Sequence, residues 1–539
     1  MKRLLAPAFA VWAGLCVCQS ISWVAEAASK SAPTVSSPAG EKQCEALAGT
    51  RVGSGFIEQA EWVERGNSLI SLKQRIMFML ALKRLSLGLE AMADHCHVIA
   101  KVRPAPGSEI TVGVWLPQPW NGKLLGVGGG GFNGGLTVAS FLVSEPLAQG
   151  YASVATDAGH DDTESAKFGY DSVEQLKDYG YRANHVGAEV AKALIASYYK
   201  SPIKRAYFHG CSNGGRDALM LARRFPEDYD GIISGAPAAD FTNLMSRFVW
   251  NQRAIDAAPK LRDKIKLVGD AVMAKCDALD GLEDNLLENP LKCSFDPAEL
   301  QCKNGDGPDC LNAAEVSSLR KIYSGPRLTD GTQIYPGMPV GGEAIEKNWT
   351  AWLFDLPPMG PETFRWMVHR DPTWEIGRFD LVRDTALANE RLGPIVNSND
   401  PDLSAFMSRG GKLLMYHGWN DAAIPAGATL DYFAALRGKL GPVADQQARL
   451  FMIPGMMHCG EGPGASQFDK LTVLDRWVES GTAPERIIAT EYDPPAGLIV
   501  LPGAKKLGTR PLCAWPGTAH YNGTGSTDDA VNFVCRGPN

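Results

Sequence analysis

Short apolar runs alternate with longer amphipathic stretches from about residue 109 onward. The apolar runs are rich in Val, Ile, Leu and Ala and are bounded by Gly, Pro and Asn, which is typical of strands. The strands predicted in this way span 110–116, 123–127, 151–156, 205–210 and 229–234. Apolar residues at helical spacing predict helices over 186–199 and 216–225. Strands that alternate with helices predict a mostly parallel sheet that is covered on both faces.

The alternation of strands and helices stops between about residues 240 and 400. This stretch carries four cysteines, many Trp and Pro residues and an acidic cluster. The alternation resumes with predicted strands at 412–416 and 449–453. We therefore interpret residues 241–399 as an insertion that forms a lid over the carboxyl-terminal edge of the sheet, where open α/β sheets bind ligands. Residues 43–240 and 400–539 would form the main domain.

The first 27 residues have the features of a secretory signal peptide. Two basic residues precede a mostly apolar run from Leu4 to Cys18, and Ala25-Glu26-Ala27 supplies a small-x-small cleavage site. Residues 28–42 predict a flexible leader. The alternatives are a membrane anchor, for which the run is short, and a lipoprotein, against which stand the bulky residues before Cys16 and Cys18. We expect a secreted or periplasmic protein.

Composition places the mature chain among soluble globular proteins. Of the 539 residues, 45% are hydrophobic and 21% are charged. A net charge of −7, without a basic run interleaved with aromatic residues, argues against a nucleic-acid partner. The apolar stretch 76–89 is interrupted by Lys83 and Arg84 and is too short to cross a bilayer, so it predicts a surface helix. No membrane association is expected after cleavage, and the sequence leaves the oligomeric state open.

A candidate nucleophile lies in Gly210-Cys211-Ser212-Asn213-Gly214, which has the form G-x-S-x-G. A predicted strand precedes this string and a predicted helix follows it, as in the nucleophile elbow of α/β-hydrolases. A glycine-rich loop with a capping serine is the alternative. Cys211 is a second candidate nucleophile, but a free thiol is not expected to persist in an oxidising compartment. Ser212 is therefore the predicted nucleophile.

The acid and the base of a catalytic triad are predicted downstream of Ser212. In α/β-hydrolases the order along the chain is Ser, then Asp or Glu, then His. Asp421 follows the predicted strand 412–416, and His458 follows the predicted strand 449–453. Loops just past strand ends are where these two groups belong. A helix cap for Asp421 and an ordinary loop histidine for His458 are the structural alternatives.

The oxyanion of a tetrahedral intermediate needs backbone N–H donors. One should come from Asn213, the residue after the nucleophile, and the other from the early strand-to-helix loop. The glycine run 128–135 fits this loop, and we select Gly131 within it. A phosphate-binding loop is the rival interpretation, but the run lacks the Lys-Ser/Thr ending of that motif.

Ten cysteines follow the predicted cleavage site, and an even number in a secreted protein predicts up to five disulfides. Spacing alone favours the short-range pairs Cys276–Cys293, Cys302–Cys310 and Cys513–Cys535. Cys211 and Cys459 each adjoin a triad candidate, so a bridge between them could hold the nucleophile and the base together. Cys44 and Cys96 remain.

Two clusters suggest metal ligands. Asp277, Asp280 and Asp284 surround a glycine turn in the segment 276–286, and Ca²⁺ prefers carboxylate and carbonyl oxygens on such loops. The spacing is not that of an EF-hand, and a solvated acidic loop is the alternative. The string His95-Cys96-His97 suggests zinc only weakly, because it lacks a distant pair of ligands.

Three strings together resemble the tannase and feruloyl esterase family of α/β-hydrolases. They are Gly210-Cys211-Ser212-Asn213-Gly214-Gly215-Arg216, Tyr416-His417-Gly418-Trp419-Asn420-Asp421 and Pro454-Gly455-Met456-Met457-His458-Cys459. The resemblance runs from about Cys44 to the C-terminus. It implies an α/β-hydrolase fold whose lid is inserted between the nucleophile elbow and the catalytic acid. It also implies the triad Ser212, Asp421 and His458.

The same resemblance implies further site residues. It pairs Cys211 with Cys459 and Cys44 with Cys96, and it agrees with the three short-range bridges. It implies a structural Ca²⁺ held by the side chains of Asp277, Asp280 and Asp284 and by the backbone oxygens of Leu282 and Leu286. The family includes a hydrolase of mono(2-hydroxyethyl) terephthalate, whose lid arginine for the substrate carboxylate aligns with Phe364, next to Arg365. The stretch 76–89 departs from the family, and residues 71–90 receive no role.

These observations predict a secreted serine carboxylesterase, with no organic cofactor, that acts on small aromatic esters such as feruloyl or galloyl esters. The tryptophans of the lid are candidates to stack on the substrate ring, or else form ordinary lid core: Trp349, Trp352, Trp366 and Trp374. The alternatives are a terephthalate-ester hydrolase, a catalytically inactive binding protein on the same fold, and a secreted peptidase.

Overall fold

The computed structural model describes residues 38–66, 93–160, 165–355, 359–501 and 503–537. The predicted signal peptide and the apolar stretch 76–89 lie outside these residues. Helix α1 (Pro38–Glu45) begins inside the segment that we expected to be a flexible leader, so residues 38–42 are helical. The disulfide Cys44–Cys96 anchors this helix to the sheet. The composition of the segment does not indicate this helix.

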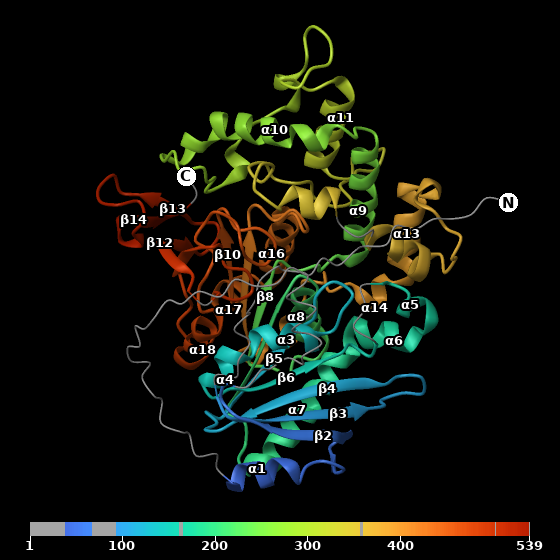
Figure 1. Cartoon of the computed structure of the whole chain (residues 1–539), viewed down its shortest axis with the longest axis vertical. Coiled ribbons are helices and arrows are strands. Elements are labelled where there is room, and N and C mark those ends of the chain that lie inside the picture. Colours follow the sequence, from blue (N-terminus) through green and yellow to red (C-terminus); the bar gives the residue numbers. More distant parts are fainter. Residues whose placement is uncertain (1–37, 67–92, 161–164, 356–358, 502, 538–539) are drawn as a thin grey trace, which may run out of the picture. The chain divides into compact units, whose positions relative to one another are not determined.

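A ten-stranded sheet forms the centre of the fold, in the order β1-β2-β3-β4-β6-β5-β7-β8-β9-β10 (Figure 1). Strands β5 to β10 pair in parallel, whereas β1 to β4 and the β4–β6 pair are antiparallel. The strands span Arg51–Val52, Gly55–Val63, His95–Val102, Ile110–Pro117, Lys123–Val127, Ala152–Thr156, Arg205–Cys211, Gly231–Gly235, Lys412–Gly418 and Ala448–Ile453.

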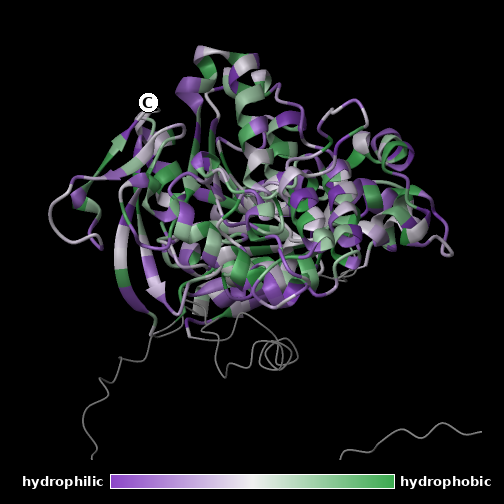
Figure 2. Cartoon of the chain, turned by 90° about the horizontal axis from the view of Figure 1, so that it is seen from above, coloured by the Kyte–Doolittle hydropathy of each residue, from purple (hydrophilic) through white to green (hydrophobic). Residues whose placement is uncertain are grey.

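Neighbouring residues of the central strands point to opposite faces of the sheet, where two hydrophobic clusters form. Leu124, Phe208 and Leu413 join the cluster on one face, and Leu125, Tyr207 and Leu414 join the other. Helices α7 (Ala183–Tyr199), α8 (Asn213–Arg224) and α16 (Ala426–Leu440) contribute to the first cluster, and α3 (Gly135–Leu142), α4 (Ser144–Ala148) and α18 (Lys470–Ser480) to the second. The helices carry both hydrophobic and hydrophilic residues (Figure 2).

The predicted strands and helices of the main domain are all present, with ends shifted by a few residues. The antiparallel strands β1 to β3 were not predicted. Burial alternates along β3 from Cys96 to Val102, but the histidines at 95 and 97 obscure this pattern in the sequence. The mostly parallel sheet therefore carries an antiparallel edge.

The segment between β8 and β9 is built from helices, and its described part contributes no strand to the sheet. Figure 1 shows α9, α10 and α11 beyond the ends of the central strands. A third hydrophobic cluster joins residues of this lid, such as Phe241 and Phe364, to residues of the main domain. The lid elements include α9 (Phe241–Asp256), α10 (Leu261–Cys276), α11 (Ala313–Ser324), η5 (Thr350–Phe354), α12 (Met359–Glu362), η6 (Thr363–Val368), α13 (Leu381–Arg391) and α14 (Gly393–Val396).

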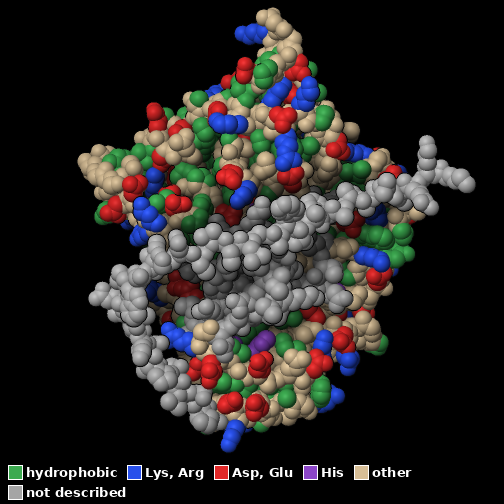
Figure 3. Space-filling view, viewed as in Figure 1, with side chains coloured by type: hydrophobic (Ala, Val, Ile, Leu, Met, Phe, Trp, Pro, Cys, Tyr) green, Lys and Arg blue, Asp and Glu red, His purple; other side chains and the backbone are tan. Residues whose placement is uncertain are grey.

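The C-terminal segment forms two small antiparallel sheets beside β10. They pair β11 (Arg486–Asp493) with β12 (Lys505–Cys513), and β13 (Thr518–Tyr521) with β14 (Phe533–Arg536). No helix in the described part of the chain has the length and apolarity needed to cross a membrane. Basic and acidic side chains are interspersed over the described surface in Figure 3.

Candidate active site

Ser212 occupies a sharp turn between β7 and α8. Its backbone has φ 63° and ψ −123°, a conformation that non-glycine residues rarely adopt. Such strain is characteristic of a nucleophile elbow, which exposes the serine hydroxyl above the sheet. A Cβ atom on Gly210 would collide with the carbonyl oxygen of Gly214, so the turn requires glycine at that position. The G-x-S-x-G string therefore forms the predicted elbow.

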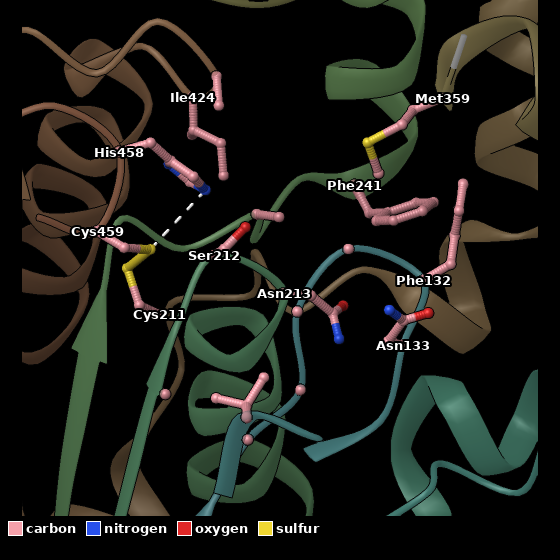
Figure 4. A pocket seen from close by; sticks show the side chains of 18 of the residues that line it. Phe132, Asn133, Cys211, Ser212, Asn213, Phe241, Met359, Ile424, His458 and Cys459 are labelled. Carbon is pink, nitrogen blue, oxygen red and sulfur yellow. Dashed lines mark hydrogen bonds between the residues drawn. A yellow bond between two sulfur atoms is a disulfide. The ribbon is translucent and has the colours of Figure 1, made fainter. Parts of the chain in front are cut away.

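Asp421 and His458 meet at the carboxyl ends of β9 and β10. The Nδ1 atom of His458 lies 2.7 Å from Oδ2 of Asp421. The other carboxylate oxygen, Oδ1, accepts hydrogen bonds from the N–H groups of Ala423 (2.9 Å) and Ile424 (2.8 Å). The loop after β9 thus fixes the carboxylate, and the carboxylate in turn orients the imidazole. The Nε2 edge of His458 faces the pocket that Ser212 also lines (Figure 4).

A second histidine supports the same carboxylate. Burial disfavours the ionised form of Asp421, but the neighbouring His458 and His417 hold its pKa well below the usual range. The buried Nε2 of His417 lies 3.3 Å from Oδ2 of Asp421 and 2.8 Å from the carbonyl oxygen of Ile424. The sequence predicted no role for His417, although its position four residues before Asp421 is a signal that could have indicated one.

A disulfide joins the elbow to the loop of the base. Cys211 and Cys459 are bonded, with their Cα atoms 5.9 Å apart, although 248 residues separate them in the sequence. The Sγ atom of Cys459 lies 3.8 Å from Nε2 of His458 (Figure 4). Because the two half-cystines directly adjoin Ser212 and His458, the bridge ties the positions of these residues together. It also removes Cys211 from consideration as a nucleophile.

The glycine-rich loop after β5 packs backbone against backbone on the start of α8. A Cβ atom on Gly128 would come within 2.7 Å of the Cα atom of Gly214, and one on Gly214 within 2.7 Å of the oxygen of Gly129. Gly131 lies in the same loop with φ 59°. Asn213 opens helix α8, whose first N–H groups have no acceptor within the helix. The predicted oxyanion residues thus lie on two backbone segments in contact.

These groups surround an apolar pocket with a volume of about 470 Å³. The lid contributes residues from α9 (Phe241, Leu244, Met245 and Phe248), together with Trp352 and Met359. The described lining residues include no Asp, Glu, Lys or Arg. Burial lowers the pKa of His209, also in the lining, to about 3, which keeps its imidazole neutral. The pocket therefore suits an uncharged, largely apolar group.

The comparison with known families decides the identity of the fold. A family model described as tannase and feruloyl esterase matches residues 96–536. The chain belongs to this family. It is similar to mono(2-hydroxyethyl) terephthalate hydrolase of Piscinibacter sakaiensis, with 32% identity over 83% of this chain and 86% of that protein. It is also 32% identical to a probable feruloyl esterase B-2 of Aspergillus flavus, over 74% of this chain and 80% of that protein.

A solved structure supports the same relationship. The crystal structure of feruloyl esterase B from Aspergillus oryzae superposes with a TM-score of 0.80 at 25% identity, covering 92% of this chain and all of that one. The chain is thus a carboxylic ester hydrolase with the α/β-hydrolase fold. The five predicted disulfides are all formed.

The lid tryptophans do not share one role. Trp352 lines the pocket, and its ring meets the ring of His458 edge to face, with centroids 4.7 Å apart. Trp349 and Trp374 are buried in the lid core, and Trp366 donates a hydrogen bond to Glu362 at 2.6 Å. Of the four candidates for stacking on a substrate, only Trp352 is therefore in position.

The lid residues at the aligned arginine position also lie away from the described pocket lining. Phe364 is fully buried and packs against Trp374 and Phe379. Arg365 donates to the carbonyl oxygen of Trp374 at 2.9 Å and pairs with Glu362. Neither residue presents a cation to the pocket.

The acidic loop gathers most of its predicted calcium ligands around one small cavity. Asp280, Leu282, Asp284 and Leu286 line a cavity of about 20 Å³, which is the size of a single water or ion. Asp277 lines a neighbouring hollow instead, and its buried Oδ1 has no hydrogen-bond partner. Within the described residues, no three His, Cys, Asp or Glu side chains converge closely enough to hold a metal ion by themselves. Carboxylate and carbonyl oxygens suit a hard cation, and Arg510, which also lines the cavity, pairs with Asp284.

Proposed function

We propose that this protein is a serine carboxylesterase that hydrolyses small esters of aromatic acids, with feruloyl-type esters as its substrate class. The single observation that carries the proposal is the convergence of the elbow residue Ser212 and the Asp421-bound His458 on one apolar pocket. The names of the relatives, a terephthalate-ester hydrolase and feruloyl esterases, support an aromatic acyl group.

In the first half of the reaction, the hydroxyl oxygen of Ser212 attacks the ester carbonyl carbon. His458 accepts the hydroxyl proton at Nε2, and Asp421 stabilises the resulting imidazolium through Nδ1. The oxyanion accepts hydrogen bonds from the N–H groups of Gly131 and Asn213. Collapse of the tetrahedral intermediate breaks the bond to the alcohol, which leaves with the proton from His458.

In the second half, His458 deprotonates a water molecule that attacks the acyl-enzyme. The second tetrahedral intermediate uses the same oxyanion donors and releases the aromatic acid, while Ser212 recovers its proton. The ring of Trp352 covers one side of His458, and Phe241 and Phe248 offer apolar area to the aromatic ring of the acyl group.

Hydrolysis of methyl ferulate, methyl gallate and mono(2-hydroxyethyl) terephthalate by wild type and Ser212→Ala tests the proposal. We expect Ser212→Ala to lose at least about 10³-fold in kcat. We expect methyl ferulate to be preferred, because the described lining residues offer no cation to the free carboxylate of the terephthalate monoester.

Three results would contradict the proposal. Equal turnover by wild type and Ser212→Ala would exclude the serine mechanism. No turnover of any ester, together with no labelling by a fluorophosphonate probe, would favour an inactive binding protein, and faster turnover of amides than of esters would favour a peptidase.

The proposal includes a structural calcium ion at the acidic loop. The carboxylates of Asp277, Asp280 and Asp284 and the carbonyl oxygens of Leu282 and Leu286 would hold it. Bound there, the cation would neutralise the mutual repulsion of carboxylates on one short loop. Support comes from the small cavity that Asp280, Leu282, Asp284 and Leu286 help to line, and from the unpartnered, buried Oδ1 of Asp277 on the same loop. The ion takes no part in the chemistry.

Chelation tests this part of the proposal. EDTA should lower the midpoint of thermal unfolding, and added Ca²⁺ should restore it, because a ligand that binds only the native state stabilises that state. Asp280→Asn should show a smaller response to both treatments. An unchanged midpoint, with no calcium found by elemental analysis, would exclude the ion.

We place the protein outside the cytoplasm, in the periplasm or the medium. Five disulfides favour an oxidising compartment, and the first 27 residues have the composition of a signal peptide. N-terminal sequencing of the exported protein should find a start near residue 28.

A further inference from the structure

Tyr179 is a buried tyrosine that the mechanism above does not use. It lies in the π-helical turn η1 (Asp178–Arg182) and is 2% exposed. Its hydroxyl oxygen is 2.9 Å from the carbonyl oxygen of Gly131 and 2.9 Å from Oδ1 of Asn213. These two residues carry the proposed oxyanion donors, and they come from separate parts of the chain. One hydroxyl therefore contacts both halves of the proposed oxyanion hole.

The Tyr179 hydroxyl is a donor to both segments. Arg216 donates from Nε to Oδ1 of Asn213 at 2.7 Å. Since a guanidinium has donors only, this bond identifies Oδ1 as the acceptor and fixes the orientation of the amide. The tyrosine has one proton, which it shares between the Asn213 side chain and the Gly131 carbonyl. Figure 4 shows Asn213 beside the loop that carries Phe132 and Asn133.

The ring of Tyr179 is held on several sides. The guanidinium of Arg216 stands over it, 4.7 Å from the ring centroid, and donates to the Tyr179 carbonyl oxygen at 2.9 Å. Phe168 and Phe241 pack against the ring, with centroids 5.2 and 6.3 Å away. Burial raises the pKa of Tyr179 well above the usual range, so the hydroxyl keeps its proton. The donor is thus fixed in place before substrate binds.

A second contact joins the same two segments. The N–H of Gly129 donates to Oδ2 of Asp217 at 3.2 Å, and Oδ1 of Asp217 accepts from Arg216 at 2.7 Å. The glycine loop is therefore attached to the start of α8 at two points, both within one buried network. Fully satisfied buried networks of this kind restrict motion.

We propose that Tyr179 is a positioning residue that aligns the N–H groups of Gly131 and Asn213 for the oxyanion. Oxyanion donors accelerate the reaction only when they are held in place before charge develops. Backbone hydrogen bonds between Gly130 and Asn133 close the turn that contains Gly131, and the Tyr179 hydroxyl holds the Gly131 carbonyl oxygen itself. The inference rests on the proposed serine mechanism, because only that mechanism forms an oxyanion here.

The variant Tyr179→Phe keeps the ring and removes the hydroxyl. We expect kcat for methyl ferulate to fall about 10- to 100-fold, with KM within about twofold, because the loss acts on the transition state. A trifluoromethyl ketone analogue of ferulate, which forms a tetrahedral adduct on Ser212, should bind more weakly by the factor lost in kcat/KM. Binding of ferulate itself should not change.

Tyr199→Phe is the matched control, because its hydroxyl also donates to a backbone carbonyl, that of Pro117 at 2.8 Å, away from the pocket. We expect wild-type kcat for this variant. Unchanged kcat in Tyr179→Phe, a change in KM alone, or equal losses in both variants would each overturn the inference. If Tyr179→Phe does not fold, Asn213→Ala removes one acceptor but keeps the N–H. It should also lower kcat and analogue affinity together, and unchanged values would overturn the inference.

Ser212→Ala, assayed in parallel, separates the two proposals. If it retains turnover, the serine mechanism fails whatever Tyr179 does. If it is inactive while Tyr179→Phe behaves as wild type, only the positioning role fails.

Discussion

At the scale of single residues, the site depends on how one buried carboxylate is satisfied. Asp421 accepts two backbone N–H groups at one oxygen and contacts two imidazoles at the other. These donors offset the cost of burying a charge and keep Asp421 ionised. An ionised Asp421 accepts a hydrogen bond from Nδ1 of His458, which in the proposed mechanism leaves Nε2 free to act as the base.

Replacing Asp421 by Asn should therefore disable the base without unfolding the protein. An amide favours the wrong tautomer of His458, so kcat should fall by about 10⁴. Steady-state rates on methyl ferulate measure the loss. Asp445→Asn, which alters an exposed ion pair with Arg437, is the control and should keep its rate. A fall of less than about tenfold in Asp421→Asn would mean that His458 is oriented by other groups.

At the scale of secondary-structure elements, the lid helix α9 joins the pocket to the lid core. Its pocket face carries Phe241 and Phe248, and its buried Arg247 donates to the carbonyl oxygen of Ala423 at 2.7 Å. Ala423 belongs to the loop that fixes Asp421. The helix therefore contacts both the apolar pocket and the loop that carries Asp421.

The N-terminal end of α9 should give the protein a measurable pH dependence. Burial raises the pKa of Asp240, the residue before the helix, to about 6. The unfolded chain releases this proton near pH 4, so the native state loses stability as pH rises from about 4 to about 6 and is level above that.

Thermal unfolding of wild type and Asp240→Asn across pH 4–7 tests this dependence. The difference in unfolding free energy between the two proteins should change by roughly 1–3 kcal/mol over that range. Asp445→Asn should follow the wild-type curve. Parallel curves for wild type and Asp240→Asn would show that Asp240 ionises normally.

At the scale of the whole molecule, the lid insertion separates Ser212 from Asp421 and His458 along the chain. The parallel strands β7 to β10 return these groups to one edge of the sheet. The bridge Cys211–Cys459 then links two loops at this edge covalently, although its cysteines are 248 residues apart in the sequence. Closing so long a loop restricts the unfolded chain more than a short bridge does.

The double variant Cys211→Ala/Cys459→Ala should lose both stability and rate. We expect the free energy of unfolding to fall by roughly 2–4 kcal/mol and kcat to fall because the His458 loop is released. Denaturant unfolding and steady-state kinetics measure the two effects. The variant Cys302→Ala/Cys310→Ala removes a lid disulfide whose cysteines are 8 residues apart in the sequence. It should lose less stability and have the wild-type kcat. Wild-type kcat in the first variant would limit the bridge to a stabilising role.

Local pattern alone was enough to predict the central strands, the elbow at Ser212, and the loops that carry Asp421 and His458. A strand buried in a sheet requires a run of apolar residues, and the elbow requires glycines at fixed spacing. Both features can therefore be recognised within a few residues of sequence. The bridge Cys211–Cys459 could be suggested in the same way, because each half-cystine is the direct sequence neighbour of Ser212 or His458.

Contacts between distant segments could not be predicted from local sequence. Nothing near Trp352 in the sequence separates it from Trp349 or Trp374, yet only Trp352 reaches the pocket. Likewise, the hydroxyl of Tyr179 and the imidazole of His417 acquire their roles from partners that folding brings to them. Packing in three dimensions selects among chemically equal side chains, and that selection depends on the whole fold rather than on the neighbours of a residue along the chain.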